Sequence, residues 1–449
     1  MHTPLIIIGA GPGGYETAVL AAQRGIEVVI IEASAVGGTC LNEGCIPTKA
    51  FCKNAQVIND LQEAELYGIE GVSYNFNFAA VTERKNNIVS QLKQGVSTLL
   101  SHKLIHLVEG KAQFVDAHTV EVNGEQYSAD NIIIATGSVS KFLPIEGAHL
   151  PGVLTSKEML ELTEIPRRLC VIGAGVIGLE FASIFNSFGS EVTVVEFCKE
   201  VLPRFDTDIA KRLKQSLSKR GIEILTQTGV TAIKQEGEEM QVSYTRKGKE
   251  ETITVDRVLM AVGRRANTDS LNLADVGIEF TPAGIKVNEM MQTNIPHIYA
   301  IGDITGGIML AHAATWHGIR ALNHICGNDN DGIRLDVIPG AVFTVPEVAT
   351  VGLTEDECKD KGIDYRCGKA FFRANGKALC MNEPDGLCKV IADAEGKLLG
   401  CHLYGPHAAD LVQEVCALIS TGATVDQLKR IIHTHPTLGE VIQTAAHSM

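Results

Sequence analysis

Short apolar runs that end in glycine clusters recur along the chain. The first run covers residues 5–8 and leads into glycines at 9–14. Residues 15–24 then show helical spacing, and a second apolar run covers residues 28–31. Apolar runs of this length, bounded by glycine, are typical of strands buried in a parallel sheet. The order strand, helix, strand predicts a βαβ unit of an α/β domain.

The same arrangement returns in the second third of the chain. Residues 169–172 form an apolar run, glycines and a helical segment follow, and another run covers residues 192–195. In both copies an acid, Glu32 or Glu196, follows the first glycine by 23 residues (9 to 32 and 173 to 196). The glycines are Gly9, Gly11 and Gly14 in the first copy and Gly173, Gly175 and Gly178 in the second.

This repeat predicts two dinucleotide sites on Rossmann-like domains. The glycines let the chain turn and let a pyrophosphate approach the helix N-terminus, and the acid bonds a ribose hydroxyl. An acid at Glu196 favours NAD, because it repels the 2′-phosphate of NADP, and Phe197 and Cys198 supply no arginine in its place.

The rest of the chain predicts a larger, four-part organisation. Residues 59–100 are charged with helical period, which predicts a solvent-facing helix pair without a site. Gly124 and Gly248 predict hairpin turns. From 336 onward, β-branched alternation gives way to an amphipathic helix at 408–421, whose apolar face we expect to pack in a dimer. The expected domains are residues 1–145 and 265–335 for the first nucleotide, 146–264 for the second, and a C-terminal α+β domain at 336–449.

Composition fits a globular multidomain enzyme of 449 residues, with 45% hydrophobic and 20% charged residues. No apolar run approaches the roughly 20 residues of a membrane span. The apolar start runs straight into glycines, so we expect a first strand and not a signal peptide. A net charge of −14 argues against nucleic acid or an anionic membrane as partner.

Two of the 12 cysteines, Cys40 and Cys45, carry the candidate chemistry. They lie just downstream of the first glycine motif, with glycines on both sides and Pro47 and Lys49 beyond. A dithiol beside a bound redox ring can pass two electrons between a thiol substrate and that ring. The scatter of the other cysteines is no disulfide framework, so a reducing cytoplasm with one functional disulfide fits best. We expect Cys52 to be a buried thiol.

These motifs together resemble the flavin-dependent pyridine nucleotide–disulfide oxidoreductases. The resemblance runs from end to end, and within the family it is strongest to members that oxidise dihydrolipoamide. Besides the two glycine motifs and the cysteine segment, it is carried by residues 134–138, 261–264, 299–303, 344–352 and 435–440.

The resemblance implies two cofactors, FAD and NAD, and no metal. It assigns FAD to Gly9, Gly11, Gly14, Glu32, Gly38, Thr39, Lys49, Gly110, Thr136, Gly137, Ser138, Asp303, Met309, Leu310, Ala311 and His312. It assigns NAD to Gly173, Gly175, Gly178, Glu180, Glu196, Val230 and Gly263. It also implies an ion pair between Lys49 and Glu180 near the flavin. The segment 298–301 independently predicts a buried strand that ends in a turn able to present Asp303 to a hydroxyl.

A dithiol substrate must lose a proton before it attacks a disulfide, because only the thiolate is nucleophilic. His435 is the candidate base, and Glu440 would orient its ring. We expect His433, two positions away, to be a surface residue, and likewise His102, His106, His118 and His149. The resemblance implies that Cys40 exchanges with the substrate, that Cys45 lies against the flavin, and that His435 serves the cysteines of a second subunit. A homodimer and a lipoyl-bearing carrier, of a 2-oxo-acid dehydrogenase complex or the glycine cleavage system, are the implied partners.

Other enzymes of the same family would differ from this chain at positions that can be checked in the sequence. A glutathione-type reductase would use NADP and need arginine where Glu196 stands. A mercuric reductase would end in a further cysteine pair, and a transhydrogenase would lack Cys40 and Cys45. A flavoprotein docking subunit with diaphorase activity is a different kind of function, which the intact residues Cys40, Cys45, His435 and Glu440 argue against as its only role.

Overall fold

The computed structural model describes residues 1–449, which divide into two compact units. The first unit comprises Met1–Ala50, Ala79–Lys141 and Gly263–Leu335, and the second comprises Phe51–Phe78, Phe142–Val262 and Asp336–Met449. The division of the chain into four domain segments stays a prediction. No helix combines the length and the apolar character needed to cross a membrane.

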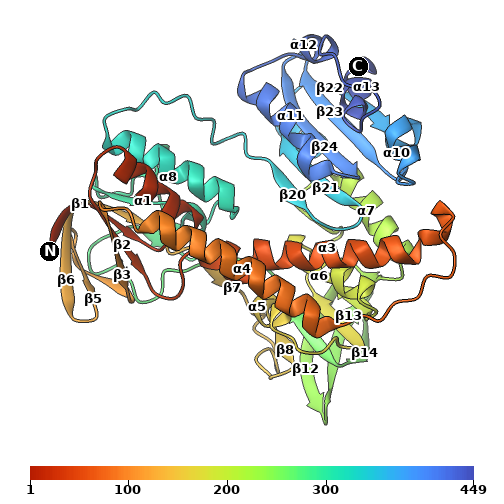
Figure 1. Ribbon diagram of the computed structural model, residues 1–449, viewed down its shortest axis with the longest axis horizontal. Coiled ribbons are helices and arrows are strands. Elements are labelled where there is room, and N and C mark those ends of the chain that lie inside the picture. Colours follow the sequence, from red (N-terminus) through yellow and green to blue (C-terminus); the bar gives the residue numbers. More distant parts are fainter. The chain divides into compact units, whose positions relative to one another are not determined.

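The first unit is built on a seven-stranded sheet (Figure 1). Its apolar strands pair in parallel, as expected for continuous apolar runs, such as residues 5–8, that are buried on both faces. A β-hairpin whose turn is Asn123-Gly124, both with positive φ, joins an antiparallel strand to the sheet, so the predicted turn is confirmed. A further antiparallel strand pairs with that one. The strands are β3 (Ile105–Glu109), β2 (Val28–Glu32), β1 (His2–Ile8), β6 (Glu125–Ile134), β5 (Thr119–Val122) and β4 (Ala112–Asp116), with β19 (Ile298–Ala300) beside β6.

Two helices, α1 (Pro12–Gln23) and α8 (Ala311–Ile325), pack against each other over one face of this sheet. Their contact is close because glycines face it: a Cβ on Gly318 would lie 1.9 Å from the Thr17 hydroxyl. The opposite face is covered by the 271–285 segment. Short elements complete the unit: β7 (Ser138–Ser140) with β16 (Arg264–Ala266), β17 (Phe280–Thr281) with β18 (Gly284–Ile285), and the 3₁₀ turn η2 (Gly302–Thr305).

The helix pair predicted at 59–100 is only partly correct, because one helix lies within these residues and the other lies almost entirely before them. Helix α3 runs from Cys45 to Gln62, and α4 covers Phe78–Leu100, with a 3₁₀ turn η1 (Ala64–Tyr67) between them. Pro47 lies in the first turn of α3, where proline costs no hydrogen bond. The charge pattern on which the prediction rested begins at residue 59. The prediction therefore missed that α3 begins at Cys45.

The second unit contains a five-stranded parallel sheet that repeats the strand–helix–strand pattern. Its strands are β11 (Glu223–Leu225), β10 (Glu191–Val195), β9 (Arg168–Ile172), β15 (Arg257–Met260) and β8 (Val153–Leu154), with helices α5 (Ser156–Leu160), α6 (Val176–Ser187) and α7 (Thr207–Lys219). An antiparallel sheet of β12 (Thr228–Glu236), β13 (Glu239–Arg246) and β14 (Lys249–Val255) accompanies it. The turn Lys247-Gly248 between β13 and β14 confirms the second predicted hairpin.

The C-terminal part of this unit is an antiparallel sheet with helices. Its strands are β20 (Gly340–Val342), β21 (Glu347–Gly352), β24 (Leu398–Gly405), β23 (Leu387–Asp393) and β22 (Tyr365–Phe371). Its helices are α9 (Glu355–Asp360), α10 (Gly376–Cys380), α11 (Ala408–Ser420), α12 (Val425–Lys429) and α13 (Glu440–His447), with the 3₁₀ turn η3 (Phe372–Ala374). The predicted fold class, two Rossmann-like domains and a C-terminal α+β domain, is confirmed.

One packing prediction needs correction. The apolar face of α11, with Val412, Val415 and Ile419, is buried in the core of its own domain against Leu403 and Cys401 of β24. An apolar helix stripe satisfies the same sequence pattern whether it packs on its own sheet or on a second chain. This stripe is used inside the domain, so it is not available for a dimer.

Candidate redox and dinucleotide sites

The first glycine motif joins β1 to α1 in a turn that only glycine fits. Gly9 has φ +108°, and a Cβ there would lie 2.4 Å from the Ala135 carbonyl oxygen. A Cβ on Gly14 would lie 1.9 Å from the Gly9 carbonyl oxygen. Gly11 precedes the helix and gives it no side-chain cap, so the first N–H groups of α1 are left for an anion.

Glu32 stands at the carboxyl end of the neighbouring strand β2. One carboxylate oxygen accepts a hydrogen bond from the Ala10 N–H at 2.7 Å, and the other accepts one from the Ser34 N–H at 2.8 Å. These bonds fix the carboxylate beside the glycine turn, which is where a ribose hydroxyl of a dinucleotide would need it. Gly110, also assigned to FAD, follows β3 and donates its N–H to the Glu32 carbonyl oxygen at 2.9 Å.

The second copy repeats these contacts one by one in the other unit. Gly173 has φ +105°, and its Cβ would lie 2.5 Å from the Ala261 carbonyl oxygen. A Cβ on Gly178 would lie 2.0 Å from the Gly173 carbonyl oxygen. The Glu196 carboxylate accepts hydrogen bonds from the Ala174 and Cys198 N–H groups, both at 2.6 Å. Gly175 precedes α6 without a side-chain cap. Both cradles therefore fit a dinucleotide by the same geometry.

A matched pair of alanine substitutions should separate the two cradles. With FAD expected at the first cradle and NAD at the second, we expect Gly178→Ala to weaken binding of NAD alone and Gly14→Ala to weaken binding of FAD alone, because each new Cβ would collide with the backbone carbonyl it faces. Overpacking of this kind typically costs about 1–3 kcal/mol. For each of the two variants, absorbance measures the flavin content and calorimetry measures the affinity for NAD. Equal effects of the two substitutions on both ligands would contradict two separate sites.

The dithiol segment follows the first βαβ unit, and its local turn and hydrogen bonds bring the two cysteines together. Cys40 lies in the short helix α2 (Gly38–Glu43), and Cys45 opens α3. Between them the chain reverses at Gly44, where a Cβ would lie 2.8 Å from the Thr39 carbonyl oxygen. The Asn42 side-chain amide donates to the Val36 and Gly38 carbonyl oxygens, both at 3.0 Å. This turn brings Cys40 and Cys45, with four residues between them, into side-chain contact.

The two thiols differ in their electrostatics. The side chain of Cys40 hydrogen-bonds the side chain of Cys45, and this bond together with burial raises the pKa of Cys40 far above its usual range, although Lys49 acts in the opposite direction. Cys45 is the first residue of an 18-residue helix, whose N-terminus favours negative charge. In the reduced pair, the raised pKa favours the thiol form of Cys40, and the helix N-terminus favours negative charge on Cys45.

The dithiol segment abuts the first glycine turn. A Cβ on Gly38 would lie 2.7 Å from the Gly11 Cα, and the Gly37 N–H donates to the Ala10 carbonyl oxygen at 2.8 Å. Two glycines at the same contact allow the backbones to meet. The redox pair is therefore built onto the loop that we expect to hold the pyrophosphate of the first dinucleotide.

Further residues assigned to FAD gather in the same unit through long-range contacts. Asp303, in η2, accepts a short hydrogen bond from the Ser138 hydroxyl. Arg264 then donates from Nε to the Ser138 hydroxyl and from Nη2 to its carbonyl oxygen, both at 2.7 Å. The Thr136 hydroxyl donates a hydrogen bond to the Asn267 carbonyl oxygen at 2.9 Å, and the Asn267 N–H donates one to the Gly137 carbonyl oxygen at 3.0 Å. The sequence motif around 261–264 drew attention to this region, but Arg264 and Asn267 were not predicted as site residues.

Other candidates are placed as follows. Met309 and Leu310 precede α8, and Ala311 and His312 are its first residues, just after the Asp303 turn. The Gly302 N–H of that turn donates to Nδ1 of buried His317 on α8, and burial lowers the pKa of His317, so the ring stays neutral and can accept. The remaining positions are Thr39 in α2, Lys49 in α3, Glu180 in α6, Val230 in β12 and Gly263, with φ +104°, just before β16.

Lys49 and Glu180 belong to different units, and their ion pair stays a prediction. Glu180 itself is buried in the second unit, where its carboxylate accepts the Phe343 N–H at 3.0 Å.

The C-terminal pair is formed within the second unit. His435 Nδ1 and Glu440 Oε1 are 2.9 Å apart, and the other carboxylate oxygen accepts the Thr437 N–H at 2.9 Å. The Thr437 N–H and His435 lower the pKa of Glu440, so the acid stays charged until the pH falls below its ordinary value of 4.5. The His435 side chain is 79% exposed. The pair has the geometry of an acid–histidine couple, with an exposed ring held by the acid.

Two side chains differ from their predicted environment. His433 was expected at the surface, but its side chain is only 7% exposed and its Nε2 lies 3.0 Å from Glu414 Oε1 of α11. The contact of His433 with α11 could not be read from local sequence. Cys52, expected to be buried, is half-buried, and its thiol contacts the Phe343 carbonyl oxygen at 3.5 Å.

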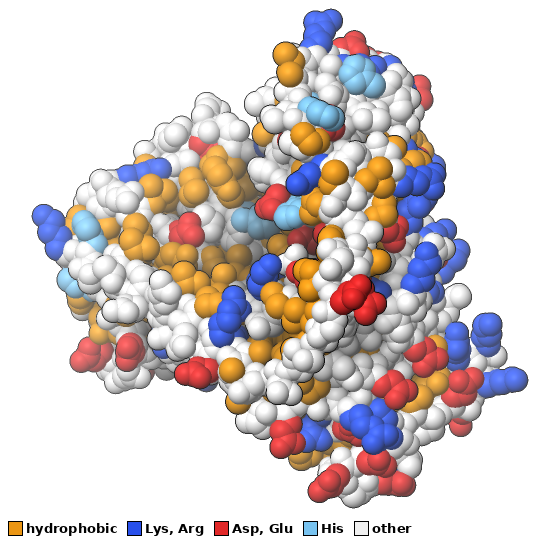
Figure 2. All heavy atoms as spheres, turned by 45° about the vertical axis from the view of Figure 1, so that its right-hand side comes forward, with side chains coloured by type: hydrophobic (Ala, Val, Ile, Leu, Met, Phe, Trp, Pro, Cys, Tyr) orange, Lys and Arg blue, Asp and Glu red, His pale blue; other side chains and the backbone are white.

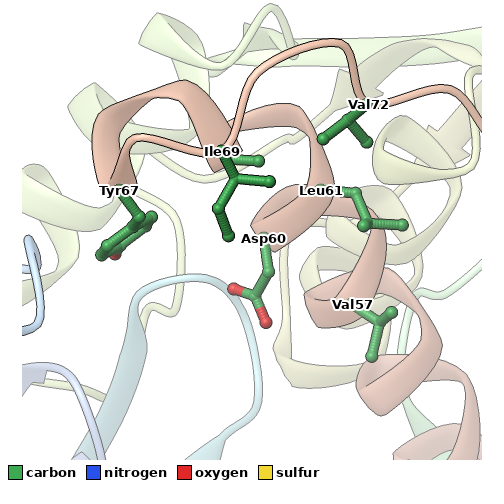
Figure 3. A pocket seen from close by; sticks show the side chains of 7 residues that line it. Val57, Asp60, Leu61, Tyr67, Ile69 and Val72 are labelled. Carbon is green, nitrogen blue, oxygen red and sulfur yellow. The ribbon is translucent and has the colours of Figure 1, made fainter.

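A separate hollow of about 350 Å³ lies at the end of α3 and contains none of the predicted site residues. Figure 3 shows Val57, Leu61, Ile69 and Val72 around it, with Tyr67 and the Asp60 carboxylate at its side. Its lining is apolar and partly exposed, which fits neither dinucleotide. On the face drawn in Figure 2, basic and acidic side chains are interspersed.

A dithiol built onto one dinucleotide cradle, in a chain that holds a second such cradle, is the arrangement of a pyridine-nucleotide-dependent disulfide oxidoreductase. The comparisons agree: the chain belongs to the pyridine nucleotide-disulphide oxidoreductase family, whose model matches residues 3–318, with its dimerisation domain at 338–446.

Curated relatives and solved structures match over the whole length. The chain is 40% identical to a dihydrolipoyl dehydrogenase of Geobacillus stearothermophilus, over 99% of this chain and 96% of the relative. It is also 40% identical to one of Thermus scotoductus, over 99% and 97%. The HOCl-induced flavoprotein disulfide reductase RclA from Escherichia coli, as a Cu(II) complex, has 29% identity and a TM-score of 0.89, over 100% of this chain and 99% of that one.

Proposed function

We propose that the protein is a dihydrolipoyl dehydrogenase that oxidises protein-bound dihydrolipoamide, with FAD at the first cradle and NAD at the second. The observation that carries this proposal is the Cys40–Cys45 pair, built onto the first glycine turn in a chain that also holds the His435–Glu440 couple. The relatives at 40% identity that bear this name support it.

The proposed half-reaction uses the chain's own side chains. His435 takes the proton of one substrate thiol, and the resulting thiolate attacks Sγ of Cys40 in the Cys40–Cys45 disulfide, so that Cys45 leaves as thiolate. The second substrate thiol then attacks the mixed disulfide. Cys40 leaves with a proton, and the substrate departs as a cyclic disulfide. Glu440 holds the imidazole and stabilises its charged form.

Bound FAD would accept the electron pair of the reduced dithiol and pass it on as hydride to NAD. The chain's part is to hold the Cys45 charge at the helix N-terminus and to keep the proton on Cys40. The match of residues 338–446 to a dimerisation domain supports a homodimer, and the proposal includes that each copy supplies its exposed His435 ring to the other.

The proposal extends to the partners and the compartment. A lipoyl arm is tethered to a carrier protein, either of a 2-oxo-acid dehydrogenase complex or of the glycine cleavage system, and both would present the same dithiol to Cys40. The scattered cysteines fit a reducing cytoplasm.

Selection of NAD over NADP should depend on Glu196. We expect Glu196→Gln to lower the preference for NAD by about tenfold or more, because the neutral amide no longer repels a 2′-phosphate and bonds the ribose hydroxyl less strongly. Glu191→Gln, exposed on the same strand, is the matched control and should change nothing. Steady-state rates with dihydrolipoamide and each nucleotide measure the preference. An unchanged ratio in the Glu196 variant would refute this role.

The likeness to RclA supports a second candidate, a disulfide reductase that runs in the opposite direction. It predicts fast oxidation of NADH or NADPH with an acceptor other than lipoamide and no reduction of NAD by dihydrolipoamide. Assays of purified protein in both directions, with lipoamide, glutathione disulfide and Cu(II) as acceptors, decide between the two.

A further inference from the structure

The segment that follows Glu196 is held at both ends. At its start, the Cys198 N–H binds the Glu196 carboxylate, and the Cys198 carbonyl oxygen accepts the Gln227 N–H at 3.0 Å. In its middle, the Leu202 N–H donates to the Ala174 carbonyl oxygen at 2.9 Å, in the glycine turn of the second cradle. At its end stands Asp206, the N-cap residue of α7. The segment 197–206 therefore joins the proposed NAD acid to the start of α7.

Asp206 is bound from the C-terminal domain by a buried lysine. Lys389 of β23 and Asp206 are each 1% exposed, and Lys389 Nζ lies 2.7 Å from Asp206 Oδ1. The same ammonium lies 2.5 Å from Glu355 and 3.5 Å from Asp208. Burial opposes the charge, but the bonds to Asp206 and Glu355 outweigh it and raise the pKa of Lys389 to about 12. The ammonium is therefore charged, and it compensates the buried carboxylate of Asp206.

Packing holds part of this segment, because the side chains of Val201 and Leu202 are buried. A hollow of about 200 Å³ lies along it, lined by residues 198–203 and by Phe205, Thr207 and Ala210. Leu202 has φ +46°, a left-handed conformation that costs a non-glycine residue free energy and persists only where its surroundings impose it. The Asp206–Lys389 contact adds an anchor at the end of this segment to the backbone hydrogen bonds of Cys198 and Leu202.

The segment that follows Glu32 in the first cradle is the equivalent of the segment that follows Glu196 in the second. Gly37 donates its N–H to the Ala10 carbonyl oxygen, as Leu202 does to Ala174, and the chain then enters the helix that carries Cys40. In the first copy, the segment after Glu32 continues directly into α2, the helix that carries Cys40. In the second copy it leads to a buried ion pair with another domain.

We infer that Lys389 is a positioning residue for NAD: by holding Asp206 it fixes the 197–206 segment and with it the Glu196 carboxylate in the second cradle. This inference rests on the proposed function, because it takes that cradle as the NAD site. NAD affinity then depends on the C-terminal domain, although Lys389 itself does not touch the cradle.

Three variants test the inference. Lys389→Met removes the ammonium, and Asp206→Asn removes its partner's charge while keeping a good N-cap residue for α7. Lys369→Met is the matched control, because this lysine contacts Asp208 and Glu355 of the same network but not Asp206. For each, calorimetry gives the dissociation constant for NAD, and stopped-flow absorbance gives the rate at which dihydrolipoamide reduces the flavin.

We expect the Lys389 and Asp206 variants to bind NAD about tenfold more weakly, with an unchanged rate of flavin reduction, and Lys369→Met to bind NAD as the wild type does. If Lys389→Met fails to fold, Asp206→Asn carries the test. Variants that melt at lower temperature but bind NAD normally overturn the inference alone. A wild-type chain that does not bind NAD at all overturns the proposed function, and this inference with it.

Discussion

Cys45→Ser is expected to abolish oxidation of dihydrolipoamide, lowering turnover by roughly 10⁴-fold or more, as removal of a covalently acting group does. Cys40→Ser should do the same, because neither residue alone can form the exchanging disulfide. Oxidation of NADH by a quinone should survive in both variants, since that reaction needs no dithiol. Steady-state assays with the two substrate pairs measure the split.

The two serine variants should also differ from each other in absorbance. In Cys40→Ser the remaining Cys45 lies at the N-terminus of α3, where negative charge is favoured, so a thiolate should be present without any reductant. In Cys45→Ser the remaining thiol is Cys40, which does not begin α3 and has lost its hydrogen-bonding neighbour Cys45. The thiolate absorbance expected for Cys40→Ser should therefore be absent from Cys45→Ser. Cys52→Ser is the control and should behave as the wild type. More than a tenth of normal turnover in Cys45→Ser would contradict the dithiol mechanism.

His435→Gln is expected to lower turnover with dihydrolipoamide by about 10²–10⁴-fold, the usual contribution of a general base. The substrate thiol then has no group to take its proton, while NADH oxidation by a quinone should be unaffected. His433→Gln is the matched control two residues away, because His433 is paired with Glu414 inside the domain. It should lower the melting temperature and leave turnover nearly intact. Equal losses of turnover in both variants would assign His435 a structural role.

Mixed dimers extend this test to the subunit arrangement. Cys45→Ser and His435→Gln chains are each expected to be inactive, but a heterodimer of the two would contain one complete site if each histidine serves the other copy. Activity that returns on refolding the two variants together would support the proposed dimer. No recovery in a mixture shown to contain heterodimers would place both groups in one chain.

Local patterns predicted much of the fold because they report local structure. The strands β1, β2, β9 and β10 are short apolar runs, and the glycine turns leave no room for a Cβ. The same periodicity could not place α3, whose first turn carries a proline and the second cysteine. It also could not say that the apolar face of α11 is buried against its own sheet.

The candidate site shows the same limit. Glu32 and Glu196 could be found from their spacing to the glycines, and His435 and Glu440 are only five residues apart. Arg264, by contrast, reaches Ser138 across 126 residues, and Lys389 reaches Asp206 across 183. Contacts over such distances depend on which strands become neighbours in a sheet, and no local pattern records that.

The central claim is that a dithiol substrate reduces the enzyme through Cys40 and Cys45 and that NAD then reoxidises it. Anaerobic stopped-flow absorbance of the purified protein, mixed with dihydrolipoamide and then with NAD or NADP, tests it most directly. The account predicts a fast red-shifted charge-transfer band from the Cys45 thiolate, which NAD removes and NADP does not. Failure of dihydrolipoamide to reduce the flavin, with ready reduction by NADPH, would contradict the account.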